Sequence, residues 1–154
     1  MDLGDLIKPE GVLPSLKAKS KKHVLQELSA AAADITGLPE RDIFDTLLQR
    51  ERLGSTGVGQ GIAIPHGKLA DLNCIIGLFA SLDQPIDFEA VDGEPVDIVF
   101  LLLAPESAGA DHLKALARIS RFLRTSSAVE GLRAARTTDA VYAILTEPEK
   151  EDAA

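Results

Sequence analysis

One histidine follows a run of closely spaced glycines near the middle of the chain. The stretch from Gly54 to Lys68 reads GSTGVGQGIAIPHGK, and its histidine is His66. A glycine can take a positive φ and lets the backbone come close to a ligand, and Pro65 stiffens the approach to the histidine. Gly67 leaves no side chain beside His66 to block a large incoming group. The stretch is therefore suited to presenting one imidazole ring to another macromolecule.

A neutral imidazole nitrogen can act as a nucleophile and hold a phosphoryl group as a phosphoramidate. Phosphoryl transfer passes through a loose transition state, so the protein contributes positioning and charge stabilisation. Three groups that stabilise negative oxygens are expected near His66: the amides of the 54–61 loop, the Arg50 guanidinium, and the N-terminus of the helix that carries His112. That helix end is also expected to lower the pKa of His112 and keep the ring neutral. The competing interpretation is a structural histidine held by hydrogen bonds.

Other chemistries lack their sequence signals. The triplet 67–69 is not a Walker A motif, because no Ser or Thr follows the lysine and the glycine spacing is wrong. The glycine repeat over 57–61 does not follow a predicted strand, as a dinucleotide fingerprint would. The histidines are scattered and Cys74 lies within a buried strand pattern, so no metal-ligand cluster is expected. A nucleophile elbow is also absent. We predict neither a bound metal nor a cofactor.

Composition narrows the class of partner. The chain has 154 residues with 16 basic and 24 acidic side chains, and its net charge of −8 argues against nucleic acid as the main partner. A basic protein partner remains compatible with that charge. A single cysteine requires no oxidising compartment. The N-terminus lacks signal-peptide features, and no apolar run is long enough to span a membrane. We therefore expect a cytoplasmic protein that binds neither nucleic acid nor membrane.

Helical patterns lie at both ends of the chain. An amphipathic helix is predicted between a Ser20 cap and Gly37, and a second one begins at Pro39 and is ended by Gly54. A third opens at residues 111–113, and a capping-box pattern starts a fourth at Ser127. Thr137 or Thr138 caps the last helix. The buried face of the third helix is predicted to comprise Leu113, Leu116, Ala117, Ser120 and Leu123.

Apolar runs in the middle of the chain predict strands. They span residues 12–18, 62–64, 74–82 and 96–103, with a small additional strand over 86–88. The 74–82 and 96–103 segments are joined by a hairpin-like excursion, so the sheet should be mixed. We predict one α/β sandwich with a central mixed sheet and helices on both faces. The single domain covers residues 1–154, with a core over about 5–147 and a charged tail over 148–154.

Several separated segments, taken together, resemble one family. The GSTGVGQGIAIPHGK stretch is similar to the active-site segment of the fructose/mannitol-type enzyme IIA domains of the bacterial phosphotransferase system. Three further segments fit that family in order: RERLGSTG from Arg50, PVDIVFLLLAP over 95–105, and HLxxL from His112. The similarity covers nearly the whole chain and is strongest to the nitrogen-related branch, called EIIA-Ntr.

The resemblance implies roles for individual residues. His66 is the phosphorylated residue, His112 is a second active-site histidine that assists it, and Arg50 is the active-site arginine. A phosphate-binding loop is formed by Ser55, Thr56, Gly57 and Gly59. The phosphoryl donor is a phosphohistidine carrier of the HPr type, called NPr in the nitrogen branch.

Three functions follow from this resemblance. The first is a regulatory phosphocarrier whose state is read by partners that govern nitrogen, carbon or potassium metabolism, such as sensor kinases, potassium transport proteins or metabolic enzymes. The second is the IIA component of a sugar transporter, which passes phosphate to a IIB protein. The third is a regulatory binding module that is not phosphorylated. The sequence leaves open the downstream partner, the oligomeric state and the imidazole nitrogen that is modified.

Overall fold

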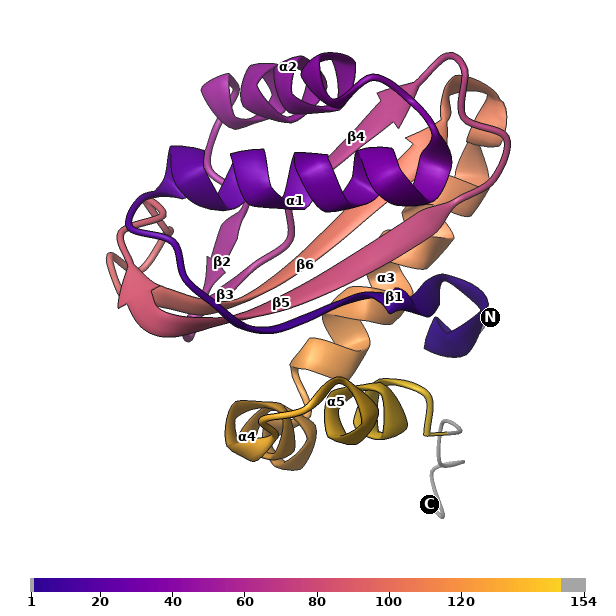
Figure 1. Cartoon of the computed structure of the whole chain (residues 1–154). Coiled ribbons are helices and arrows are strands. Elements are labelled where there is room, and N and C mark those ends of the chain that lie inside the picture. The colour runs from indigo at the N-terminus through magenta and orange to yellow at the C-terminus, as the bar shows by residue number, and fades with distance from the viewer. Residues whose placement is uncertain (1, 148–154) are drawn as a thin grey trace.

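A mixed β-sheet runs through the middle of the molecule (Figure 1). The computed structural model describes residues 2–147. Its strands are β1 (Ile7–Leu16), β2 (Gly57–Gly59), β3 (Ile62–Ala63), β4 (His66–Leu69), β5 (Ile76–Ile86) and β6 (Val96–Pro105). The order in the sheet is β1-β5-β6-β3-β2, and β4 also pairs with β6. β5 and β6 are antiparallel, whereas β1 lies parallel to β5, and β3 and β4 lie parallel to β6.

Helices cover both faces of this sheet. One face carries α1 (Lys21–Thr36) and α2 (Glu40–Arg52). The other carries α3 (Ala110–Leu123), α4 (Ser126–Ala134) and α5 (Thr138–Leu145). Two short 3₁₀ turns, Leu3–Asp5 and Glu106–Ala108, complete the described elements. The predicted α/β sandwich with a mixed sheet and helices on both faces is confirmed.

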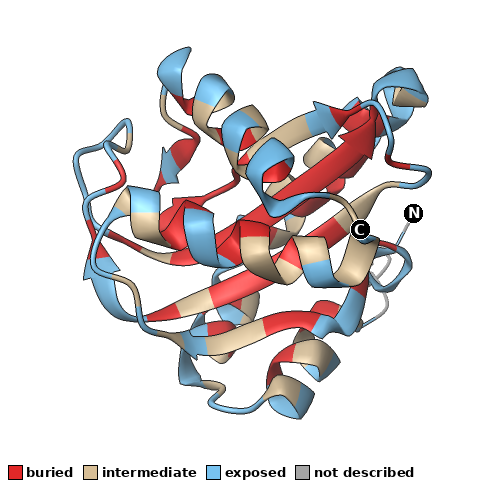
Figure 2. Cartoon of the chain, turned by 45° about the horizontal axis from the view of Figure 1, so that its top comes forward, coloured by how far each residue is buried: buried red, intermediate tan, exposed pale blue. Residues whose placement is uncertain are grey.

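β6 is buried almost throughout, as Figure 2 shows in red, and β5 is buried over most of its length before Asp83. Successive side chains of a strand point to opposite faces, and the paired residues Leu78 and Leu101 pack on the side of α1 and α2. Their neighbours Phe79 and Phe100 pack on the side of α3, α4 and α5, with ring centroids 6.5 Å apart in an edge-to-face arrangement. Two cores separated by one sheet follow from this alternation.

Capping residues set several helix ends as predicted. The Ser20 side chain accepts the His23 amide N–H at 3.1 Å, and Gly37 ends α1 in the left-handed conformation with φ 75°. The Thr137 side chain caps α5 by accepting the Ala140 N–H. Pro39 is the N-cap of α2 and not its first residue. The predicted capping box at Ser127 is wrong, since α4 begins one residue earlier without a side-chain cap.

The strand boundaries differ from the predicted ones where pairing outweighs composition. β1 begins at Ile7, because its backbone pairs with β5 from there onward. Cys74 lies before β5 and is exposed, so its placement inside a buried strand is wrong. Ile86 belongs to the end of β5 and not to a separate strand, and it pairs with Val96. β2 and β4 were not expected, because neither has an apolar run.

The buried face of α3 is rotated from the predicted one. Leu113 is 66% exposed and Ala117 is exposed as well. The residues that face the sheet include His112, Ala115 and Ile119. This helix has two possible apolar faces, and the face that carries His112 packs against the sheet. His112 is thereby placed under the sheet edge where β4 lies.

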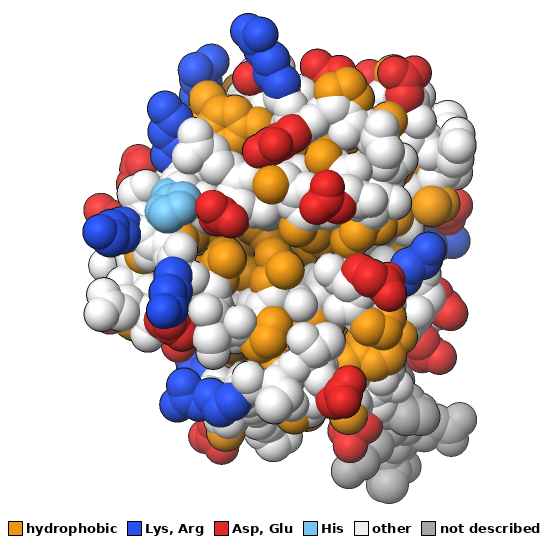
Figure 3. Space-filling view, in the orientation of Figure 1, with side chains coloured by type: hydrophobic (Ala, Val, Ile, Leu, Met, Phe, Trp, Pro, Cys, Tyr) orange, Lys and Arg blue, Asp and Glu red, His pale blue; other side chains and the backbone are white. Residues whose placement is uncertain are grey.

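The surface seen in Figure 3 carries both signs of charge. Acidic side chains are interspersed over this face, and Lys and Arg side chains gather along its left side. Among residues 2–147, no helix combines the length and the apolar character needed to cross a bilayer. The predicted charged tail over 148–154 lies outside the described residues.

Candidate active site

Close packing of α2 on β4 brings the candidate residues together. A Cβ placed at Gly67 would lie 2.7 Å from the Thr46 methyl carbon, so only a glycine lets the helix approach the strand this closely. Gly67 had been interpreted as space for an incoming group. In the structure Gly67 lines the open depression beside His66, and it is also the point where α2 contacts β4. The last turn of α2 consequently places Arg50 against His66.

Two hydrogen bonds fix the half-buried ring of His66. Its Nδ1 lies 2.9 Å from the carbonyl oxygen of Ile64, which can only accept. The Nε of Arg50 donates to the Nε2 of His66 at 3.2 Å. Together these contacts place the ring proton on Nδ1 and leave the lone pair on Nε2. The expected meeting of Arg50 with His66 across the glycine loop is present, and Arg50 Nη1 also donates to the Gly54 carbonyl at 3.0 Å.

His112 lies beside His66 with one polar atom unused. The two ring centroids are 5.7 Å apart and the rings are inclined by 51°. His112 is 7% exposed, and within residues 2–147 its buried Nδ1 has no hydrogen-bond partner. Burial lowers the pKa of His112, and the nearby charges of His66 and Lys68 lower it further. The expected direction is confirmed, but burial and these charges cause it rather than the helix end.

An open depression of about 410 Å³ gives access to these groups from solvent. Arg50, His66 and His112 line it together with Lys68. Leu53 also lines it and is 84% exposed. The half-buried imidazole of His66, the guanidinium of Arg50 and the buried imidazole of His112 thus line one accessible depression. This arrangement can accept a group with negatively charged oxygens.

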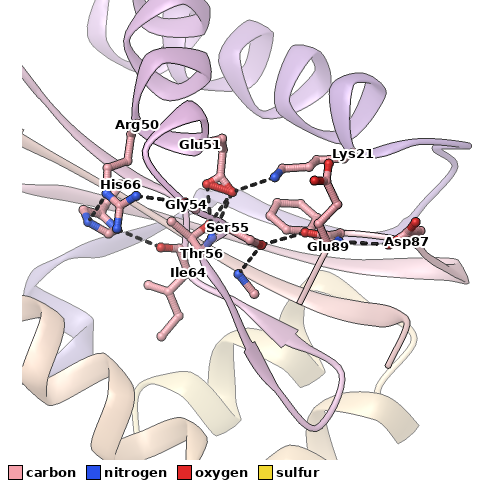
Figure 4. A network of polar contacts seen from close by, with 12 residues as sticks. Lys21, Arg50, Glu51, Gly54, Ser55, Thr56, Ile64, His66, Asp87 and Glu89 are labelled. Atoms are coloured by element: carbon pink, nitrogen blue, oxygen red, sulfur yellow. Dashed lines mark hydrogen bonds and ion pairs between the residues drawn. The ribbon is translucent and has the colours of Figure 1, made fainter. Parts of the chain in front are cut away.

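The hydroxyl groups expected in a phosphate-binding loop already have protein partners (Figure 4). Ser55 Oγ donates to the carbonyl oxygen of Phe88 at 2.7 Å and accepts the Gly57 N–H at 3.0 Å. Thr56 is 4% exposed, and its Oγ1 donates to a carboxylate oxygen of Glu51 at 2.8 Å. These contacts shape the turn that follows α2. A phosphate contact by Ser55 or Thr56 stays a prediction.

The alternating glycines pack the β2–β3 hairpin against the 90–97 segment. A Cβ at Gly57 would lie 2.8 Å from the Ala90 Cβ, and one at Gly59 would lie 3.1 Å from a carboxylate oxygen of Asp92. Gly59 and Gly61 also have φ values of 102° and 80°. The structure gives these glycines an intramolecular reason. Phosphate binding by Gly57 and Gly59 stays a prediction.

Lys68 lines the depression, and Glu51 is the chain neighbour of Arg50 in α2; neither was predicted as a site residue. Glu51 lies in the last turn of α2, where a carboxylate opposes the helix dipole and is unfavourable. That unfavourable placement was the one signal available in the sequence. Lys68 follows His66 by two residues and lines the same depression. Among the residues described, no three His, Cys, Asp or Glu side chains form a group that could hold a metal ion.

Comparison with known proteins gives consistent matches along the chain. Residues 5–147 match the family described as "Phosphoenolpyruvate-dependent sugar phosphotransferase system, EIIA 2". A protein of Bradyrhizobium diazoefficiens named "Nitrogen regulatory protein" is 62% identical over 96% of this chain and 97% of its own length. The crystal structure of Nitrogen Regulatory Protein IIA-Ntr from Neisseria meningitidis aligns with a TM-score of 0.88 at 35% identity, covering 94% of this chain and 99% of that one.

A sugar-specific relative matches as well. The "PTS system fructose-specific EIIABC component" of Bacillus subtilis is 33% identical over 97% of this chain and 24% of its own length.

Proposed function

Because this chain belongs to the EIIA 2 family of the phosphotransferase system, we propose that it is a phosphocarrier that accepts a phosphoryl group on His66 from an HPr- or NPr-type phosphohistidine protein. The single observation that supports this assignment most is the state of the His66 ring. The Nδ1–H donates to Ile64 O, so Nε2 carries the lone pair, which accepts the Arg50 Nε–H, and His66 lines an open depression. We therefore assign Nε2 as the nucleophile.

The transfer forms one P–N bond and breaks another. The Nε2 lone pair of His66 attacks the phosphorus, and the electron pair of the donor's P–N bond returns to the donor's imidazole nitrogen. The Nδ1–H of His66 remains on the ring and stays hydrogen-bonded to the Ile64 carbonyl oxygen. This hydrogen bond stabilises the positive charge that develops on the ring. No proton has to leave His66 for the new bond to form.

Arg50 and His112 serve the phosphoryl oxygens. Arg50 Nε leaves the Nε2 lone pair as phosphorus approaches and then donates to a phosphoryl oxygen, while its Nη1 remains anchored on Gly54 O. His112 is kept neutral by burial, so it can donate a hydrogen bond to a phosphoryl oxygen without placing a second positive charge beside the ring of His66. Positioned donors of this kind supply most of the catalysis in phosphoryl transfer.

The rim of the depression suits a protein partner. Leu53, which lines the depression and follows Arg50 by three residues, is 84% exposed, and Leu113, the residue after His112, is 66% exposed. Exposed apolar side chains beside a reactive group are typical of a docking surface. The net charge of −8 favours a basic donor protein. We place this encounter in the cytoplasm.

The regulatory branch is the function that we favour. The relative from Bradyrhizobium and the aligned structure from Neisseria both carry nitrogen-regulatory names. Phosphorylation of His66 adds a phosphoryl group with about two negative charges at the docking rim. Partner proteins such as sensor kinases, potassium transport proteins or metabolic enzymes would read that change.

Incubation with phosphorylated HPr-type carrier tests the proposal. We expect one phosphoryl group per chain, acid-labile and alkali-stable, and bound to Nε2 of His66 in an NMR assignment. His66→Ala should abolish the label. His23→Ala is the matched control and should retain it, because His23 lies on α1, where its Nε2 pairs with Glu27 at 3.3 Å. Full labelling of His66→Ala would remove His66 from the role.

A sugar-transport role is the second candidate, and the fructose-specific relative from Bacillus subtilis favours it. Transfer of the phosphoryl group from His66 to a IIB protein, together with loss of sugar uptake in a deletion strain, would decide for transport. A non-phosphorylated binding module is the third candidate. It would show unchanged partner binding in both His66→Ala and His66→Asp.

A further inference from the structure

Glu51 is a buried carboxylate next to Arg50 in the last turn of α2. It is 8% exposed, and its two carboxylate oxygens accept the Thr56 amide N–H at 3.1 and 3.2 Å. One of them also accepts the Thr56 hydroxyl at 2.8 Å. Lys21, the first residue of α1, places its ammonium 3.3 Å from the same carboxylate. A negative charge at the C-terminal end of a helix is unfavourable, so these partners must offset it.

A continuous path of hydrogen bonds leads from Glu51 to the reacting ring, and Figure 4 shows the labelled residues along it. The carboxylate holds the amide N–H of Thr56, and the carbonyl of Thr56 accepts the Ile64 N–H at 3.0 Å. The carbonyl of Ile64 in turn accepts the Nδ1–H of His66 at 2.9 Å. The group that sets the tautomer of His66 is therefore positioned through the turn that Glu51 holds.

A second path leads from the same turn to the guanidinium. The Gly54 amide donates to the backbone carbonyl of Glu51 at 3.1 Å, and the Gly54 carbonyl accepts Nη1 of Arg50 at 3.0 Å. The turn over residues 54–56 thus supports both Arg50 and His66. A movement of this turn would displace the two groups relative to each other.

Lys21 closes the network from the other side. Its ammonium lies 4.9 Å from the ring centroid of Phe88, and the carbonyl of Phe88 accepts the Ser55 hydroxyl at 2.7 Å. The first turn of α1, the last turn of α2 and the loop after β5 therefore meet at residues 55 and 56. A buried ion pair adds little net stability compared with apolar packing, so a role in positioning accounts for this pair better than a role in stability.

We propose that Glu51 is a positioning residue, which holds the 54–56 turn so that Ile64 O fixes the His66 tautomer and Gly54 O fixes the Arg50 guanidinium. Its effect on phosphoryl transfer rests on the proposed function. Its effect on the His66 tautomer does not, because the tautomer exists in the unphosphorylated protein.

The test compares Glu51→Ala and Glu51→Gln with Asp97→Asn in the full chain. Asp97 is the matched control: its carboxylate also pairs with a cation and supports the same glycine-rich segment, but at the far tip. The ¹⁵N shifts of the His66 ring report the tautomer, and labelling by phosphorylated HPr-type carrier reports the rate. For Glu51→Ala we expect a mixture of the two tautomers and a rate about 10- to 100-fold lower. Asp97→Asn should leave both unchanged.

The Gln variant keeps the test decisive if Glu51→Ala does not fold. Gln has the shape of Glu but one acceptor oxygen, so it should retain the fold and show a smaller change in both measurements. A single Nδ1–H tautomer with an unchanged rate in a folded Glu51 variant would overturn the proposal. If the wild-type protein takes no label, the proposed function fails while the tautomer comparison still decides the role of Glu51.

Discussion

The glycine-rich segment between α2 and β4 forms a hairpin with two ends in space. One end is the tip of the hairpin, beside Arg133, and the other is its base at α2 and β4, beside Arg50. At the hairpin tip, Arg133 donates to both carboxylate oxygens of Asp97 at 3.0 to 3.2 Å and to the Gln60 carbonyl at 2.8 Å. Asp92 accepts the Gln60 N–H at 2.9 Å and the Glu94 N–H at 3.0 Å. These amide contacts, led by the one from Gln60, lower the pKa of Asp92. The guanidinium of Arg133 at the tip is therefore engaged in a bidentate ion pair with Asp97.

At the other end, hydrogen bonding is incomplete. Arg50 donates from Nε to a single ring nitrogen at 3.2 Å, and the neighbouring His112 has a buried nitrogen without a partner within residues 2–147. An open depression lies over these groups. An arginine beside a glycine-rich segment is therefore not a sufficient sign of a site. Unused hydrogen-bonding capacity next to an accessible hollow distinguishes the end at His66 from the tip.

Replacing each of the two arginines by alanine is the strongest test of this contrast. Arg50→Ala should lower the rate of phosphorylation by about 1000-fold, because it removes the cation that meets the transferring group. Its free energy of unfolding should change little. Arg133→Ala should leave the rate unchanged and lower the free energy of unfolding by about 1 to 2 kcal/mol, since it breaks a half-exposed bidentate pair. Initial rates with phosphorylated carrier and urea unfolding measure the two quantities.

A lysine variant at residue 50 refines the comparison. Arg50→Lys keeps the charge but lacks the planar fork of donors that reaches His66 and Gly54 together, so it should recover only part of the rate. A rate loss of equal size in Arg133→Ala would contradict the division between the two ends.

His112→Phe separates function from stability at the second histidine. A phenyl ring fills nearly the same space and removes a buried nitrogen that has no partner, so the free energy of unfolding should stay the same or rise by about 1 kcal/mol. The phosphorylation rate should fall by about 100-fold, because one donor to the phosphoryl oxygens is lost. Chemical unfolding and labelling of the same preparation give both numbers. A large loss of stability would mean that the ring serves the fold and not the site.

Some of this arrangement is predictable from the sequence because it depends on neighbours in the chain. Apolar runs at 74–82 and 96–103 indicated paired central strands, and the cap residues Ser20 and Thr137 indicated helix starts. A short loop between Arg50 and His66 was enough to expect their meeting. In each case the signal lies within a few residues of the feature that it predicts.

The rest depends on contacts between distant segments. The face of α3 could not be chosen from its own pattern, since two apolar stripes compete and the sheet selects the one with His112. The role of Gly67 depends on Thr46 in another element, and β4 is recognisable only through its pairing with β6. Glu51 finds its partners in Lys21 and Thr56, which no single-sequence pattern connects.

Acid should lower the free energy of unfolding through His112, and this is the smallest of the predicted effects. Burial and the charges of His66 and Lys68 hold the pKa of His112 below its ordinary value of 6.5. As the pH falls through that ordinary value, His112 becomes protonated in the unfolded chain while it stays neutral in the folded protein. The free energy of unfolding should therefore decrease from about pH 6.5 down to the lowered pKa, and this contribution should be constant above that window. His112→Phe lacks this decrease but keeps His66 and His23, so the difference between the two urea-unfolding profiles isolates His112. Parallel profiles from pH 8 to 5 would show that the His112 ring has the same pKa in the folded and unfolded states. The fold would then not keep His112 neutral beside His66, and the contrast between the two ends would be weaker.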